Sequence, residues 1–126
     1  VPEPACLVQL VGAEAMLGMA DLAIEEGDRD EVRALLPKVR TIAERCHDPR
    51  MLGRSLNSEA LLEQSQSAFD KSLKLLERAH DAFAKVADTT NLTVVDANIG
   101  VTWMHLGRLD RAIPKLSSAL AEYTAS

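Results

Sequence analysis

Apolar residues recur at three- and four-residue spacing along most of the chain, which predicts amphipathic helices rather than strands. Short polar or glycine-containing breaks separate six such segments. We expect helices at about 5–26, 28–46, 50–65, 67–86, 92–106 and 109–123, with a polar loop at 88–91. Aromatic residues make up 3% of the chain, which also favours helices, because strands prefer β-branched and aromatic residues.

The breaks at Gly27, Ser67 and Gly107 are spaced by forty residues. A fixed period of this length is typical of helical repeat proteins, so we expect matching helix–turn–helix hairpins. Three further columns share the spacing, with small or apolar residues in each: Ala20, Ala60 and Gly100; Leu36, Leu76 and Leu116; Val39, Ala79 and Ala119. The pattern predicts one domain, 1–126, of three units at about 5–48, 49–88 and 89–126. Because the chain opens without Met, we expect it to be part of a longer protein.

The last third of the chain resembles the tetratricopeptide-repeat (TPR) family in six positions: Gly100, Gly107, Leu109, Ala112, Leu116 and Ala119. Earlier units depart from that pattern, with Ser67 in place of the turn glycine and with Arg29 and Val32 where an apolar and a small residue are expected. The resemblance implies an all-α fold, a right-handed superhelix of three antiparallel helix pairs. The usual unit has about 34 residues, and a period of forty is similar to the extended version in large bacterial regulators and sensor proteins.

The resemblance also implies a concave groove, lined by the first helix of each pair, that holds a protein or peptide partner. The family's groove positions correspond here to Glu14, Leu17, Asp21, Arg54, Asn57, Leu61, Gln64, Ala97, Val101, Met104 and His105. The first unit's positions are acidic and the third unit's are apolar, which favours a ligand with one basic and one apolar end. The alternative is a solvated helix face with scattered apolar residues. The family's two-carboxylate clamp is not expected, since Leu17, Asp21, Leu61 and Val101 occupy its positions.

Charge and hydropathy limit the other partners. The net charge of −5 provides no basic surface for nucleic acid. No uninterrupted apolar run reaches the roughly 18 residues that a membrane span needs, and no signal peptide is visible. We therefore expect a cytoplasmic domain that contacts neither nucleic acid nor membrane.

Reactive side chains are few. Cys6 and Cys46 lie at similar distances before and after Gly27, so the first hairpin would bring them to the same end. A disulfide is geometrically possible, but a cytoplasmic location favours two half-buried thiols. With His47 they supply three zinc ligands and no fourth. His80 and His105 stand alone on their helices, and no catalytic motif accompanies them. We expect no metal, no cofactor and no enzymatic activity.

Three functional interpretations follow. The first is a protein- or peptide-binding module within a bacterial signalling or transcription-regulatory protein. The second is a self-association module that forms a homodimer through a terminal hairpin exposing Ile113, Leu116 or Leu120. The third, ranked last, is an enzyme or a small-effector-binding sensor domain.

Overall fold

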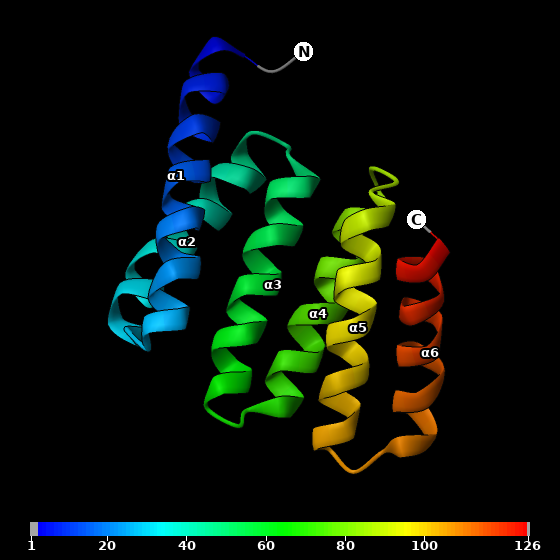
Figure 1. Ribbon diagram of the computed structural model, residues 1–126. Coiled ribbons are helices and arrows are strands. Elements are labelled where there is room, and N and C mark those ends of the chain that lie inside the picture. Colours follow the sequence, from blue (N-terminus) through cyan, green and yellow to red (C-terminus); the bar gives the residue numbers. More distant parts are fainter. Residues whose placement is uncertain (1–2, 126) are drawn as a thin grey trace.

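The computed structural model describes residues 3–125 as six helices, each antiparallel to the next, packed in chain order (Figure 1). Their bounds are α1 (Pro4–Glu26), α2 (Arg29–Arg45), α3 (Pro49–Ser65), α4 (Phe69–Ala84), α5 (Thr89–His105) and α6 (Leu109–Ala125). Helices adjacent in the sequence pack on one another throughout. The predicted all-α fold of three consecutive helix pairs is confirmed.

The turns repeat every twenty residues, which is half of the predicted period. Residues 27, 47, 67, 87 and 107 all have positive φ. In each turn the next backbone amide donates to the carbonyl five residues earlier, at 2.9–3.1 Å. This is the Schellman helix ending. The predicted bends at Gly27, Ser67 and Gly107 are therefore equivalent, and the turns between units, at His47 and Ala87, have the same geometry without a glycine.

Aspartates cap three of the helices. The side chains of Asp28, Asp48 and Asp88 accept hydrogen bonds from backbone amides three residues later. Each satisfies an amide that has no partner within the helix. The predicted polar loop at 88–91 is wrong, because the Asp88 cap allows α5 to begin at Thr89.

Small residues sit where two helices meet, as the column pattern predicts. Ala20, Ala60 and Gly100 are buried in the first helix of each pair. A Cβ added at Gly53 would lie 2.8 Å from the Phe83 ring, and one at Gly100 would lie 2.7 Å from the Leu116 side chain. The α3–α4 and α5–α6 contacts thus depend on the absence of these side chains.

A disulfide joins Cys6 to Cys46, with their Cα atoms 5.6 Å apart. The interpretation of two separate thiols is wrong, because the hairpin brings both residues to the same end. The repeat would start α1 at Gln9, yet the helix starts at Pro4, and this extension rises above the other helices (Figure 1). The disulfide ties the extension to the end of α2.

Among residues 3–125, α1 is the one helix long and apolar enough to cross a membrane by length and composition, with a mean hydropathy of 1.5 over the qualifying window. The expectation that no segment of the chain is apolar enough to cross a membrane is wrong. Polar residues interrupt the apolar residues of α1, but the mean hydropathy of the helix stays as high as that of a membrane span. A core helix passes the same test. One side of α1 has that character, since Ala13, Leu17, Ala20 and Ala23 are buried in a cluster shared with α2 and α3.

Candidate partner-binding groove

The first helices of the three pairs, α1, α3 and α5, lie side by side on one face of the stack, which we call the inner wall (Figure 1). Side-chain hydrogen bonds join them across the units. Arg54 of α3 donates to Glu14 of α1 at 2.5 Å, and the Ser58 hydroxyl donates to Asp21 at 2.6 Å. Between the second and third units, the Asn98 side-chain amide of α5 donates to Asn57 of α3 at 3.0 Å. The wall is therefore a continuous polar-bonded surface rather than three separate helix faces.

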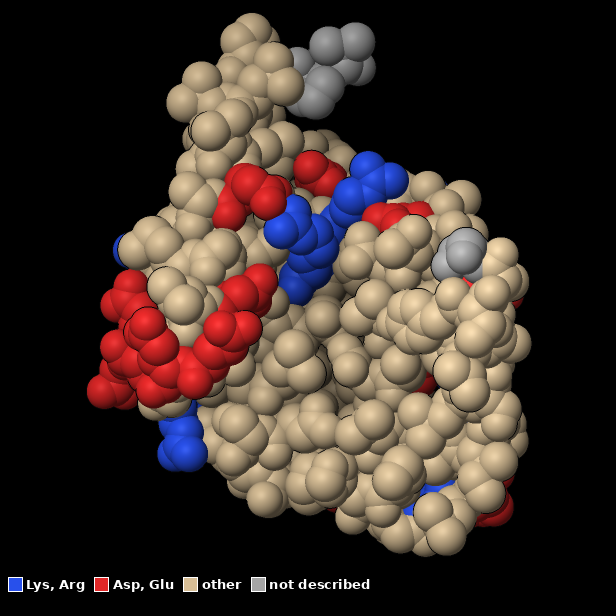
Figure 2. Space-filling view, in the orientation of Figure 1, with Lys and Arg blue, Asp and Glu red and all other residues tan. Residues whose placement is uncertain are grey.

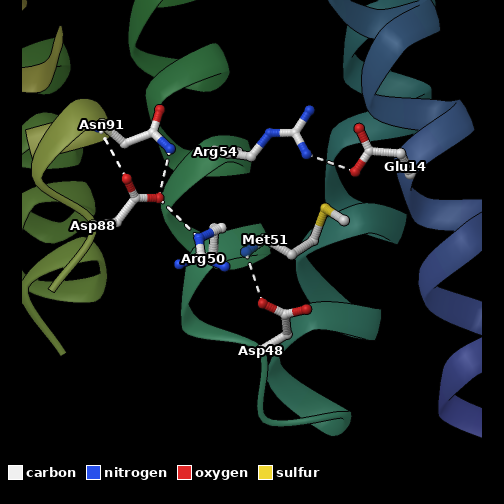
Figure 3. Close-up of polar contacts among 7 residues, drawn as sticks. All are labelled: Glu14, Asp48, Arg50, Met51, Arg54, Asp88 and Asn91. Carbon is white, nitrogen blue, oxygen red and sulfur yellow. Dashed lines mark hydrogen bonds and ion pairs between the residues drawn. The ribbon is translucent and has the colours of Figure 1, made fainter. Parts of the chain in front are cut away.

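One end of the wall holds a network of paired charges (Figure 3). Arg50 at the start of α3 donates to the Asp88 carboxylate at 2.8 Å, and the Asn91 side-chain amide donates to the same carboxylate at 2.7 Å. Hydrogen bonds from Asn91 and, to a smaller extent, Arg50 lower the pKa of Asp88. The hydrogen bond from Arg54 likewise lowers the pKa of Glu14. Arg50 and Arg54 thus each have a carboxylate partner within the wall.

Exposed carboxylates gather at the turn between α1 and α2 (Figure 2, lower left). The group consists of Asp21, Glu25, Glu26, Asp28 and Asp30, all exposed. Among the described residues, no lysine or arginine forms an ion pair with any of them. The group therefore carries net negative charge at the α1–α2 end of the inner wall, offset only in part by the charge interaction of Asp21 with Arg54.

Apart from the paired charges near its upper end, the rest of the viewed face is nearly free of charged side chains (Figure 2). Leu61, Ala97 and Val101 are half-buried, and Met104 is 49% exposed. The His105 ring lies parallel to that of Phe69, with ring centroids 4.5 Å apart. The wall therefore changes from acidic to apolar along the stack.

The predicted groove residues divide into exposed, half-buried and buried. Glu14, Asp21, Met104 and His105 are exposed; Arg54, Asn57, Leu61, Gln64, Ala97 and Val101 are half-buried. Leu17 is 1% exposed and belongs to the core cluster. Its assignment to the groove surface is wrong, because α1 turns this position toward α2 and α3 rather than outward.

Some of the residues that bond across units are not among the residues predicted from the sequence. Ser58 and Asn98 lie one position beyond predicted groove residues, forty apart. Arg50 and Asp88 follow the turns between units, at His47 and Ala87, where no glycine marks the turn. Within residues 3–125 no three His, Cys, Asp or Glu side chains are arranged to hold a metal ion.

Among solved structures, the chain is similar to the TPR domain of Arabidopsis FLU, with a TM-score of 0.83 and 12% sequence identity. The match covers 96% of this chain and 99% of the other. The fold is that of a TPR domain. No family model and no curated protein sequence matches this chain.

Proposed function

We propose that the inner wall of this TPR domain binds a segment of a partner protein that has basic residues at one end and apolar residues at the other. The basic end lies against the acidic group at the α1–α2 turn, and the apolar end lies over Leu61, Val101 and Met104. The observation on which this proposal depends is the change from unpaired carboxylates to uncharged surface along one face.

The two ends contribute different parts of the binding. The carboxylates attract the basic end and fix its direction, and this attraction weakens with salt because the group is exposed. The apolar end contributes about 25 cal/mol for each Å² of apolar surface removed from water. Arg54 adds little attraction for a carboxylate, since Glu14 already neutralises it.

Fluorescence polarisation with a labelled peptide tests this proposal. The peptide has a lysine-rich half and a leucine-rich half, and a scrambled peptide of the same composition is its control. We expect the ordered peptide to bind at least tenfold more tightly than the scrambled one. Equal affinity for the two peptides would contradict the proposal.

Variants identify the face involved. Leu61→Glu combined with Met104→Glu should abolish peptide binding, and Glu25→Lys should weaken it and reduce its salt dependence. The matched controls are Ala121→Glu on α6 and Glu77→Lys on α4, both exposed residues of second helices. If the control variants weaken binding as much as the groove variants, the bound face is not the inner wall.

We also propose that the module serves within a larger signalling or transcription-regulatory protein. The support is the resemblance of its forty-residue period to the repeats of such proteins. A cytoplasmic location is part of that proposal and is harder to reconcile with the Cys6–Cys46 bond, because disulfides persist mainly in oxidising compartments. Alkylation of cell extracts under acid quench, followed by mass spectrometry of the two cysteines, tests the location: a reduced pair supports the cytoplasm and an oxidised pair opposes it.

A further inference from the structure

We infer that the cleft between α2 and α3 binds a small aromatic carboxylate. This α2–α3 cleft has a volume of about 300 Å³, at the lower end of the range for small-molecule sites. Lys71, at the start of α4, closes one side of it. None of the residues that line the cleft belongs to the groove on the inner wall, so this inference stands independently of the proposed function.

The α2–α3 cleft has an apolar part and a charged part. The apolar part consists of Val32 and Leu36 of α2 and Leu62 of α3, which are all buried. The charged part is made of five side chains from the three helices: Arg33, Arg40, Glu59, Glu63 and Lys71. A ligand that fits both parts has an apolar body and a charged group.

The matching contact in the next unit is filled by apolar side chains. Three positions of the α2–α3 cleft have apolar counterparts forty residues later: Arg33 and Leu73, Leu36 and Leu76, and Glu59 and Ile99. These counterparts belong to one core cluster, and Trp103 packs against that cluster. Trp103 is itself the counterpart of Glu63. A carboxylate side chain therefore stands where the next unit has an indole, and the smaller side chain accounts for the open space.

A cation lies against this position in both units. The guanidinium carbon of Arg111 lies over the Trp103 ring, 4.8 Å from the ring centroid. Its counterpart Lys71 lies 3.5 Å from the Glu63 carboxylate. An aromatic ring in the α2–α3 cleft would pack on the apolar part and lie near the Lys71 ammonium, an arrangement that is favourable for the face of a ring. The repeat thus indicates an aromatic body for the ligand.

Hydrogen-bond donors without a partner indicate the charged group of the ligand. Glu59 is already paired with Arg40, and the Glu63 carboxylate is paired with the Lys71 ammonium. Within residues 3–125, however, the buried Nε–H of Arg40 has no hydrogen-bond acceptor. Arg33 forms no ion pair in the same part of the chain. A carboxylate supplies the acceptor oxygens that two guanidinium groups lack.

The charge of the α2–α3 cleft also favours an anion. Three cationic side chains line it against two carboxylates, whereas the whole chain has a net charge of −5. Burial and, after it, the charge of Arg78 lower the pKa of Arg40, while Glu44 acts in the opposite direction. A bound carboxylate would offset both the burial and the repulsion, because it places a negative charge beside the guanidinium.

Amide chemical shifts of the 126-residue chain, on titration with indole-3-propanoate, test the inference. This probe has the ring of tryptophan and one carboxylate. The controls are propanoate, which lacks the ring, and indole-3-propanamide, which lacks the charge. We expect the probe to bind about tenfold or more tightly than either control, with shifts concentrated at residues 32–40 and 59–71. Equal binding of the three compounds, no saturation up to about 10 mM probe, or shifts concentrated on the inner wall would overturn the inference.

A single charge variant tests the recognition of the carboxylate. Arg33→Gln should weaken binding of indole-3-propanoate about fivefold or more, because one of two guanidinium groups is lost. Arg45→Gln is the matched control, since Arg45 is an exposed arginine of α2 outside the cleft. Wild-type affinity in Arg33→Gln, or an equal loss of affinity in the two variants, would overturn the inference.

A second variant fills the α2–α3 cleft with the side chains of the next unit. Glu63→Trp with Lys71→Arg reproduces the pair that Trp103 and Arg111 form, and it should abolish binding of the probe. Its circular dichroism spectrum should match that of the wild-type chain, because the fold already accommodates this pair forty residues later. Wild-type affinity in a folded variant would overturn the inference. If this variant does not fold, Arg33→Gln and its control decide the question.

Discussion

At the scale of single residues, two of the contacts between helices require glycine, because a side chain at that position would collide with the neighbouring helix. Gly53 lies against the Phe83 ring, and Gly100 lies against Leu116. By contrast, Gly12 on α1 has no atom within 4 Å of the place where a Cβ would be. The same residue type therefore has opposite effects on stability at different positions.

Alanine substitution distinguishes these glycines. Gly53→Ala should lower the free energy of unfolding by about 1 kcal/mol, because an overpacking cost of about 2 kcal/mol exceeds the helix-propensity gain of about 1 kcal/mol. Gly12→Ala should raise it by about 0.5–1 kcal/mol. Urea denaturation measures both. Stabilisation by Gly53→Ala would show that the α3–α4 contact is looser than described.

Ser67 is the residue in the middle hairpin turn that replaces glycine. Its φ is +60°, close to the +77° of Gly27 and the +76° of Gly107. A residue with a Cβ is strained there by about 1 kcal/mol. Ser67→Gly should raise the free energy of unfolding by about 0.5–1 kcal/mol, and the reciprocal Gly107→Ser should lower it by about 1 kcal/mol. Thermal unfolding checks the pair, and shifts of the same sign in both variants would contradict the equivalence of the turns.

At the scale of helices, the cap of α5 also connects two units. Asp88 accepts from the Asn91 amide at the start of α5 and from Arg50 on α3. Its lowered pKa means that the folded state holds the carboxylate charged. The resulting stabilisation is fully present above the pKa of the unfolded chain, about 3.9 for an aspartate. It is lost as the pH falls through the lower folded-state pKa.

Asp88→Asn should keep the cap and lose the charge. The wild-type chain should therefore be more stable than the variant at pH 6, and the difference should shrink as the pH falls below about 4. Urea midpoints at several pH values measure this difference. Asp30→Asn is the control, since Asp30 has no ion-pair partner among the described residues. A difference that grows in acid would contradict the assigned pairing.

The disulfide links α1 and α2 at a sequence separation of forty residues. Closing a loop of that size in the unfolded chain stabilises the fold by about 3–4 kcal/mol. Cys6→Ser with Cys46→Ser should lower the free energy of unfolding by about that amount. It should also speed amide exchange at residues 4–12 more than in the other helices. Exchange in α5 should remain slower or faster than in α6, whichever holds in the wild-type chain. Unchanged exchange at the start of α1 would mean that the bond does not hold the extension.

At the scale of the whole molecule, the sequence predicts the fold well and the site in part. The columns at Ala20, Ala60 and Gly100 and the turns at Gly27, Ser67 and Gly107 predict the stack, because small residues and positive φ leave clear patterns. His47 and Ala87 adopt the same turn conformation without glycine, so the repeat of the turns every twenty residues could not be seen in the sequence. Leu17 was misplaced because the family's groove position falls here on the buried side of α1. The Arg50–Asp88 and Ser58–Asp21 contacts join units and have no local pattern that could predict them.

The central claim is that α1, α3 and α5 present one partner-binding face. Amide chemical-shift changes in this 13.7 kDa chain, on titration with the lysine–leucine peptide, test it most directly. The account predicts shifts that concentrate at residues 21–30, 54–64 and 94–105, on the three first helices and the α1–α2 turn, with α4 and the rest of α2 unchanged. Shifts concentrated on α2 and α4, or spread evenly over all six helices, would contradict it.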